Sequence, residues 1–146
     1  MEKFDLCVIG GGPSGYAAVM RALDFGKKVI LIEKDKVGGA GVFNGALASK
    51  TMWELSKDIL RMRRTMKRFS DTRHVNIDFK KIKLEVDQAV AERHQHLLGH
   101  IHDLKDAGYK DIFYFKRGYG KLLTKHEVEI TLKEGGTETI SAEDII

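Results

Sequence analysis

A glycine turn between an apolar run and a helical segment places the strictest limit on the fold of this chain. Residues 4–9 are mostly apolar and stop at three consecutive glycines, which is typical of a short buried strand that ends in a tight turn. Residues 14–25 carry small and good helix-forming side chains, and Gly26 fits the end of that helix. Residues 29–32 predict a second strand. This order of elements, completed within about 30 residues, is that of a βαβ unit.

The glycines follow the spacing G-x-G-x-x-G, and an acidic residue follows the second predicted strand. Gly10 permits the tight turn, Gly12 lets the backbone approach a diphosphate, and Gly15 permits close packing of helix on strand. The diphosphate is expected against the N–H groups at the helix N-terminus. Glu33 can accept hydrogen bonds from the ribose hydroxyls of an adenosine. The pattern predicts a bound dinucleotide without separating FAD from NAD, and the alternative is a glycine turn that only packs well.

Length and composition predict one globular domain over residues 1–146. Of the 146 residues, 42% are hydrophobic and 32% are charged, which is not the composition of a disordered chain. The 25 basic residues are interspersed with 21 acidic ones, and this argues against a nucleic-acid partner despite the net charge of +4. A solvated helix face is preferred over a docking patch for an acidic partner or phosphate at one basic run: Arg61, Arg63, Arg64, Lys67 and Arg68.

The single cysteine, Cys7, lies in the first apolar run and is predicted to be a small buried hydrophobic residue. One cysteine excludes an internal disulfide and fits a reducing cytosol. No apolar stretch approaches the length of a transmembrane helix, and the acidic and glycine residues near the N-terminus do not support a signal peptide. We therefore expect a cytoplasmic protein without a membrane span.

The predicted fold class is α/β, with a Rossmann-like parallel sheet, an inserted long helical hairpin and a small antiparallel β-meander. The glycine-rich residues 34–44 predict a loop. Apolar residues at helical spacing predict two helices that pack as a hairpin, over residues 45–68 and from residue 79 to near Gly108, with a polar break at residues 70–76. Strands are predicted at residues 112–115, 119–123, 128–132, 137–140 and 145–146, with a turn at residues 134–136. The final apolar pair resembles a strand that is cut off, so we expect a fragment of a longer chain.

Residues 38–50, GGAGVFNGALASK, resemble the active-site loop and helix of the flavoprotein disulfide reductases, the family of dihydrolipoamide dehydrogenase. In that family the segment reads G-G-T-C-x-N-x-G-C-x-P-S-K. Gly41 and Ala46 stand where the family has its two redox cysteines, and Ala48 stands where it has proline. The matching positions are Gly38, Gly39, Gly45, Ser49 and Lys50. The helical pair, residues 116–122 and residues 140–146 also resemble the family, so the likeness covers essentially the whole chain.

The resemblance implies FAD as the cofactor and NAD(P)H as a second partner of the full-length protein, and family members are usually homodimers. It places Lys50 beside the flavin ring and the backbone near Gly120 against the adenine, although an ordinary solvated lysine is the alternative for Lys50. The glycines from residue 38 to residue 41 would wrap the ribityl and diphosphate region. With the glycine motif, the expected cofactor-binding residues are Gly10, Gly12, Pro13, Ser14, Gly15, Glu33, Lys34, Gly38, Gly39, Ala40, Gly41, Lys50 and Gly120.

The missing cysteines limit the chemistry that this chain can support. Disulfide exchange needs one thiolate that attacks and a second that resolves, and neither Gly41 nor Ala46 supplies sulfur. Cys7 cannot replace them, because a buried strand residue lacks exposure and a partner. No catalytic residue is assigned, and the resemblance leaves an FAD-dependent oxidoreductase that takes hydride from NAD(P)H. The alternatives are a non-catalytic FAD- or nucleotide-binding regulatory module and an NAD-binding dehydrogenase domain.

Two groups of side chains on the predicted helices can be interpreted either as structural or as functional. Four histidines lie close together on the second helix: His94, His96, His100 and His102. The i, i+4 spacing of His96 and His100 can bind a metal, but no zinc-enzyme motif accompanies it, so we predict an exposed polar face and no metal site. On the first helix, Trp53 with Met52 and Met62 is predicted to pack in a core rather than to line a flavin-side pocket.

Overall fold

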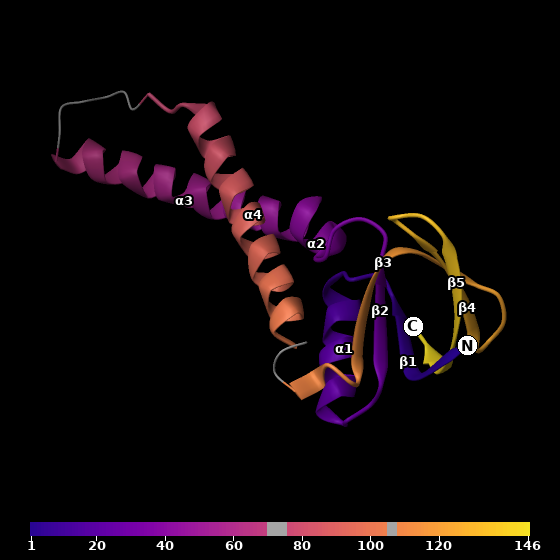
Figure 1. Ribbon diagram of the computed structural model, residues 1–146. Coiled ribbons are helices and arrows are strands. Elements are labelled where there is room, and N and C mark those ends of the chain that lie inside the picture. Colours follow the sequence, from indigo (N-terminus) through magenta and orange to yellow (C-terminus); the bar gives the residue numbers. More distant parts are fainter. Residues whose placement is uncertain (70–75, 105–107) are drawn as a thin grey trace. The chain divides into compact units, whose positions relative to one another are not determined.

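The computed structural model describes residues 1–69, 76–104 and 108–146 and has a mixed α/β fold (Figure 1). Its elements are β1 (Glu2–Ile9), α1 (Pro13–Asp24), β2 (Val29–Glu33), α2 (Gly39–Phe43), α3 (Ala46–Phe69), α4 (Phe79–Leu104), β3 (Phe113–Leu122), β4 (Glu127–Leu132) and β5 (Thr137–Ile145). The polar break predicted at residues 70–76 lies mostly outside the described residues. Between the end of α4 at Leu104 and the helix end predicted near Gly108, residues 105–107 also lie outside them.

The described residues form two compact units. The sheet unit consists of residues 1–39 and 94–146, and the helical unit consists of residues 40–93, so α4 contributes to both. The single FAD-binding domain that we predict over residues 1–146 stays a prediction.

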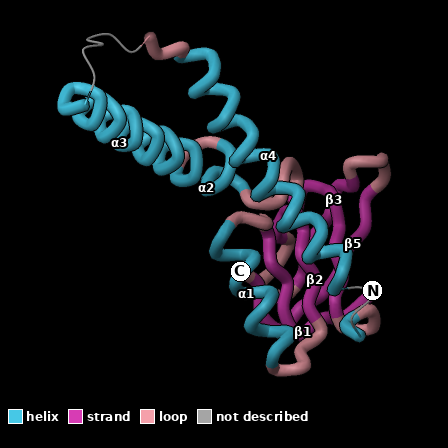
Figure 2. The backbone as a smooth tube through the Cα atoms, turned by 90° about the vertical axis from the view of Figure 1, so that its left-hand side faces the viewer, coloured by secondary structure: helices cyan, strands magenta, loops and turns pink. Residues whose placement is uncertain are grey.

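The five strands form one sheet that closes on itself (Figure 1, Figure 2). β1 runs parallel to both β2 and β5, and β2 runs parallel to β3. β4 joins β3 to β5 in antiparallel pairing. The α/β class is thus confirmed, and so is the antiparallel meander, which β3, β4 and β5 form. β3 and β5 also belong to the parallel part of the sheet.

Long strands that change partner explain why the sequence suggested more and shorter strands. β3 pairs with β2 as far as Arg117 and with β4 from Gly118 onward, so the predicted strands at residues 112–115 and 119–123 are one element. β5 likewise continues from its antiparallel pairing with β4 into its parallel pairing with β1, which joins the strands predicted at residues 137–140 and 145–146. In the gap between the two predicted strands, at residues 116–118, the chain only passes from one partner to the next.

The core lies inside the closed sheet, and α1 covers the outside of β1 and β2. All five residues of β2 are buried, as expected for a strand with packed groups on both faces. The cluster takes alternate side chains from β2, β4 and β5, together with two residues of β1 that are three apart. Its members are Phe4, Cys7, Ile30, Ile32, Val128, Ile130, Ile140 and Ala142. Val19 and Leu23 are the buried residues of α1, which ends at Asp24 and is followed by Gly26 with φ +66°. The predicted βαβ order and the helix stop at Gly26 are confirmed.

The helical unit packs less completely than its amphipathic pattern predicted. α3 matches the predicted helix within one residue at each end, yet no side chain along its fully described length is buried. The C-terminal end of α3 and the N-terminal end of α4 stand apart in Figures 1 and 2, so the predicted hairpin packing is only partial. Trp53 is 64% exposed and Met62 is 42% exposed, so the prediction that these two pack in a core is wrong.

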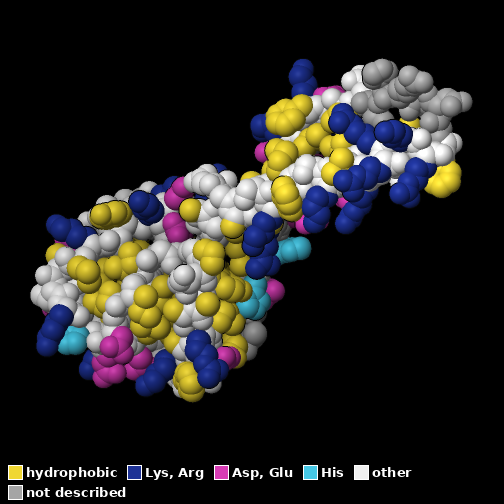
Figure 3. Space-filling model, turned by 180° about the vertical axis from the view of Figure 1, so that it is seen from behind, with side chains coloured by type: hydrophobic (Ala, Val, Ile, Leu, Met, Phe, Trp, Pro, Cys, Tyr) yellow, Lys and Arg dark blue, Asp and Glu magenta, His cyan; other side chains and the backbone are white. Residues whose placement is uncertain are grey.

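The basic run of α3 is solvent-exposed, as the sequence predicted. Arg61, Arg63, Arg64, Lys67 and Arg68 are all exposed. Figure 3 shows Lys and Arg side chains gathered over the helical unit. Arg61 forms an exposed ion pair with Asp58 at 3.0 Å, which contributes little to stability. Among the helices in the described part of the chain, none is long and apolar enough to cross a membrane.

Candidate functional site

The first glycine turn, at residues 10–12, joins β1 to α1 and packs closely against the sheet and the helix. The Gly10 N–H donates to the carbonyl oxygen of Ile32 at 2.8 Å, which ties the turn to β2. At Gly15, a Cβ would stand 1.9 Å from the carbonyl oxygen of Gly10, a distance that no side chain tolerates. The first turn of α1 therefore crosses directly over the glycine turn, and only glycine allows that crossing.

Gly12, unlike Gly15, has open space where a Cβ would stand. It is the N-cap residue of α1, it makes no side-chain cap, and Pro13 follows at the start of the helix. A Cβ at Gly12 would have no neighbour within 4 Å among the described atoms. The first N–H groups of a helix lack intrahelical partners, and the first turn of α1 carries no acidic side chain. This surface of the turn is open and suited to an anionic group such as a diphosphate.

Glu33 at the end of β2 is buried and braces the glycine turn. Its Oε2 accepts a hydrogen bond from the Gly11 N–H at 2.6 Å, and its Oε1 accepts one from the Asp35 N–H at 2.7 Å. Only 8% of the residue is exposed. Sequence reasoning assigned Glu33 to ribose hydroxyls and did not foresee these backbone contacts. The ribose contact stays a prediction, and each oxygen keeps a further lone pair for it.

Replacing Glu33 with glutamine is expected to lower the free energy of unfolding by about 1–3 kcal/mol. The amide has one accepting oxygen where the carboxylate has two, so one backbone N–H loses its acceptor and faces an NH₂ group. Urea denaturation followed by circular dichroism measures the change. Glu134→Gln in the exposed turn before β5 is the control and should stay within about 0.5 kcal/mol of wild type. Equal losses in the two variants would contradict the bracing role of Glu33.

The second glycine turn, at Gly38 and Gly39, follows β2 and lies against the first. The Gly38 N–H donates to the carbonyl oxygen of Gly11 at 2.7 Å. Gly39 has φ +50°, and a Cβ there would stand 3.2 Å from the Cα of Gly12. Both conformation and contact thus favour glycine at this position. Within the sheet unit, the structure brings the two predicted cofactor turns together.

Of two other predicted cofactor residues, Gly120 lies in β3 and Lys34 lies near the β3 residue Tyr119. Gly120 pairs with Ile130 of β4, and a Cβ on Gly120 would stand 3.3 Å from Cγ2 of Ile9. Lys34, directly after Glu33, has its Nζ 5.9 Å from the ring centroid of Tyr119. An exposed cation–π contact of this kind is worth about 0.5–1 kcal/mol. The adenine contact predicted at Gly120 remains a prediction.

The remaining predicted cofactor residues belong to the helical unit. The predicted loop at residues 34–44 is corrected in part, because α2 forms there and includes Ala40 and Gly41. Lys50 is exposed on α3. The cofactor roles of Ala40, Gly41 and Lys50 therefore rest on the resemblance alone.

Cys7 is confirmed as a buried residue of β1, with 0% of its surface exposed. Burial raises the pKa of the Cys7 thiol from 9.0 to about 11, because the charged thiolate is poorly solvated in the core. At neutral pH the side chain is a neutral thiol and not a nucleophile. It cannot take the place of the family's redox cysteines.

The raised pKa of Cys7 predicts a loss of stability between about pH 9 and about pH 11. In that range the unfolded chain releases the thiol proton and the folded chain keeps it, so rising pH favours unfolding. Two pKa units correspond to roughly 2–3 kcal/mol in the free energy of unfolding. Urea denaturation at pH 8, 9, 10 and 11 measures the decline for wild type and for Cys7→Ala. The variant should decline less; parallel curves would contradict the prediction.

Two contacts at this site were not foreseen from the sequence. The Nδ1 of His94 on α4 lies 2.9 Å from the carbonyl oxygen of Val37, the residue before the second glycine turn. The Nδ1 of His100 forms a hydrogen bond with the hydroxyl of Tyr16, which follows Gly15. A signal existed, because both histidines border a buried apolar stripe of α4, but the sequence analysis predicted an exposed polar face for the four histidines. Within the described residues, no group of three or more metal-ligating side chains is assembled.

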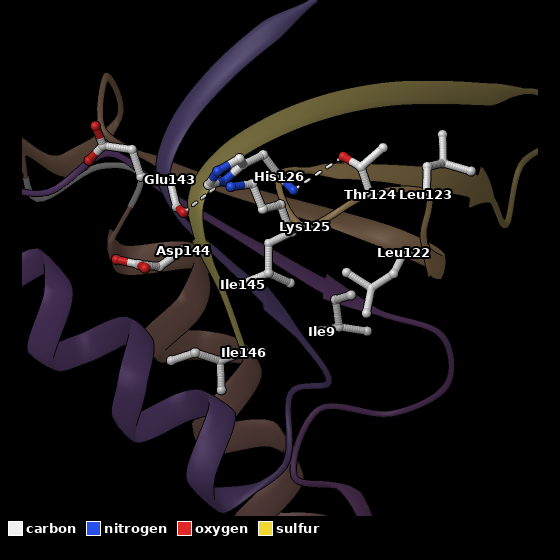
Figure 4. A pocket seen from close by; sticks show the side chains of 10 residues that line it. All are labelled: Ile9, Leu122, Leu123, Thr124, Lys125, His126, Glu143, Asp144, Ile145 and Ile146. Carbon is white, nitrogen blue, oxygen red and sulfur yellow. Dashed lines mark hydrogen bonds between the residues drawn. The ribbon is translucent and has the colours of Figure 1, made fainter.

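A separate open cavity of about 840 Å³ lies at one end of the closed sheet (Figure 4). In Figure 4, Ile9, Leu122 and Ile145 point toward one another on its apolar side. His126 Nδ1 lies 3.1 Å from the carbonyl oxygens of both Ala142 and Glu143, so this ring serves to hold β5. The lining residues include none of the predicted cofactor residues: Ile9, Leu122, Leu123, Thr124, Lys125, His126, Glu143, Asp144, Ile145 and Ile146.

The sequence profile of one family, described as pyridine nucleotide-disulphide oxidoreductase, matches residues 4–146. Dihydrolipoyl dehydrogenase of Bacillus subtilis is 31% identical over 122 residues, which cover 83% of this chain and 24% of that protein. The mitochondrial dihydrolipoyl dehydrogenase of Dictyostelium discoideum is 27% identical over 146 residues, which cover 99% of this chain and 29% of that protein. The matched residues thus span between 24% and 29% of the length of these two relatives.

A solved structure supports the fold. The copper(II) complex of the HOCl-induced flavoprotein disulfide reductase RclA from Escherichia coli superposes with a TM-score of 0.71 at 18% identity. The match covers 99% of this chain and 28% of the other. At this identity the likeness concerns the arrangement of helices and strands only.

Proposed function

Because the chain belongs to the pyridine nucleotide-disulphide oxidoreductase family, we propose that it forms the FAD-binding portion of an NAD(P)H-dependent flavoprotein oxidoreductase that works without a cysteine pair. The relatives named above are oxidoreductases, and members of this family are flavoproteins. The choice of FAD, the use of NAD(P)H and the loss of dithiol chemistry are the parts that we propose. The cytoplasm is the proposed location, in keeping with a single buried cysteine.

The observation that carries the proposal is the pair of glycine turns that meet at the start of α1. The Gly38 N–H bonds to Gly11, and Gly39 packs on the Cα of Gly12, yet the position of a Cβ at Gly12 stays open. The two turns thus offer backbone N–H donors and place no side chain over the start of α1. A diphosphate requires both of these features. A turn that served packing alone would not need an open Gly12.

The cofactor roles follow from this arrangement. The diphosphate would lie over the helix start, and the adenosine would extend toward Glu33, Lys34 and Gly120. The isoalloxazine ring would lie toward Lys50, as the family resemblance implies. The proposed contact residues are Gly10, Gly12, Pro13, Ser14, Gly15, Glu33, Lys34, Gly38, Gly39, Ala40, Gly41, Lys50 and Gly120.

The absence of the family's cysteine pair decides which reaction we propose. When bound, FAD supplies the acceptor for a hydride from reduced nicotinamide. Gly41 and Ala46 occupy the positions of the family's cysteines in the sequence, and Cys7 is buried with a raised pKa. The protein's own residues therefore bind and orient the cofactor and do not form a disulfide with the substrate. Electrons would leave the flavin directly to a separate acceptor.

Reconstitution with FAD tests the proposal. Purified chain, freed of flavin and checked for folding by circular dichroism, is titrated with FAD and passed through gel filtration. One flavin retained per chain supports the proposal. Folded chain that retains no FAD but binds NAD would favour the NAD-binding dehydrogenase alternative and overturn ours.

The choice between enzyme and regulatory module needs the full-length protein. With bound FAD, the flavin absorbance band should bleach when NADH or NADPH is added under anaerobic conditions. A flavin that stays oxidised with both nucleotides would favour the non-catalytic module.

A further inference from the structure

We propose that the histidine clamp of α4, defined as the contacts of His94 with Val37 and of His100 with Tyr16, fixes both glycine turns for cofactor binding. His94 is then a positioning residue that acts on the cofactor through the backbone and does not touch it. The inference rests on the proposed function, because the two turns matter only if they hold the dinucleotide. It concerns the sheet unit alone, which contains every residue of the clamp.

The placement of the two histidines follows from the periodicity of α4. Leu97, Ile101 and Leu104 are buried and form one apolar stripe in the part of the helix that belongs to the sheet unit. An α-helix turns by about 100° per residue, so His94 and His100 fall on opposite borders of this stripe. Burial of the stripe fixes the rotation of the helix. Each imidazole is thereby aimed at a different turn.

His94 controls the second glycine turn through Val37. The Val37 carbonyl can only accept a hydrogen bond, so the Nδ1 of His94 carries the proton in the 2.9 Å contact. Val37 is itself 2% exposed, and the next residue, Gly38, donates to the Gly11 carbonyl at 2.7 Å. A continuous series of hydrogen bonds therefore runs from α4 through the second turn to the first. Gly11 in turn donates to the carboxylate of Glu33.

His100 controls the first glycine turn through Tyr16. The rings of Tyr16 and His100 have centroids 5.8 Å apart, and the hydroxyl of Tyr16 is hydrogen-bonded to Nδ1 of His100. Tyr16 lies in the first turn of α1, and its N–H donates to the carbonyl oxygen of Gly12 at 2.9 Å. The start of α1 is thus tied to α4 beside the position where the diphosphate would bind.

Glycine-rich turns lose much conformational freedom when they are ordered, and this loss weakens ligand binding when it occurs on association. The clamp imposes the order before the ligand arrives. Removal of the clamp should therefore weaken FAD binding without removing any atom that contacts FAD.

Three variants test the role of His94. His94→Ala removes the donor, and His94→Asn places an amide N–H close to the position of Nδ1. His96→Ala changes an exposed histidine two residues along the same helix and is the control. A net hydrogen bond corresponds to about a tenfold change in an equilibrium constant. We expect the Kd for FAD to rise about tenfold in His94→Ala, to stay within about threefold of wild type in His94→Asn, and to be unchanged in His96→Ala.

Amide hydrogen exchange in the flavin-free chain separates the clamp from the cofactor proposal. The Gly38 N–H should exchange about tenfold faster in His94→Ala than in wild type or His96→Ala, because opening of the second turn exposes it. Wild-type and His94→Ala proteins with equal FAD affinity and equal Gly38 exchange would overturn the inference. Wild type that binds no FAD would overturn the proposed function and the cofactor role of the clamp, whereas faster Gly38 exchange would still support the clamp itself.

Discussion

Replacing Gly15 with alanine is expected to lower the free energy of unfolding by about 3–5 kcal/mol. The added Cβ would stand 1.9 Å from the carbonyl oxygen of Gly10 and 3.1 Å from a methyl carbon of Val8. A backbone oxygen cannot turn aside as a flexible side chain can, so α1 must move away from β1. That movement opens the packing of Val19 and Leu23 on the sheet.

Urea denaturation followed by circular dichroism measures this loss. Gly99→Ala is the matched control, since Gly99 lies in the interior of α4 and a Cβ there meets no described atom within 4 Å. Alanine at an exposed helix position should raise the free energy of unfolding by up to about 1 kcal/mol. If Gly15→Ala unfolds at the same urea concentration as wild type, the close crossing of α1 over the glycine turn is wrong.

Replacing Gly12 with alanine is expected to reduce FAD affinity about 100-fold or more while leaving the fold intact. Gly12 has φ −71° and ψ −178°, an extended conformation that alanine adopts readily and that suits a residue before proline. Because a Cβ there has no described neighbour within 4 Å, nothing in the protein resists it. It would instead occupy the space over the helix start where the diphosphate is proposed to lie.

Two measurements on the same preparation separate these effects. FAD titration gives the affinity, and urea denaturation without FAD gives the free energy of unfolding, which should equal or exceed that of wild type by up to about 1 kcal/mol. Gly99→Ala should bind FAD as wild type does. Gly12→Ala with wild-type affinity would mean that the dinucleotide, if bound, lies elsewhere.

Sequence reasoning succeeded where the signal was local. The strand, glycine turn, helix and strand of the first 33 residues, the stop at Gly26 and the burial of Cys7 were all predicted. Each depends on residues that are close together in the sequence. Small side chains, positive φ angles and apolar periodicity all act between such near neighbours. The start of α3 and the start of α4 at Phe79 were predicted for the same reason.

The predictions from sequence failed where the outcome depended on contacts between segments that are far apart in the sequence. The sequence predicted two strands, at residues 112–115 and 119–123, but both belong to β3, which changes its pairing partner from β2 to β4 after Arg117. Trp53 suggested a core position, but it is 64% exposed. Apolar periodicity states which face of an element can be buried, and it does not state whether another element arrives to cover it.

By itself, the sequence determined the βαβ start, the glycine spacing, the lack of a second cysteine and the likeness to a flavoprotein family. Only the tertiary structure decided that the sheet closes, that Glu33 bonds to the backbone of Gly11 and Asp35, and that His94 reaches Val37. The physical reason is range: turn chemistry and periodicity are written in neighbouring residues, whereas these contacts join residues that become neighbours only when buried strands and helices pack together.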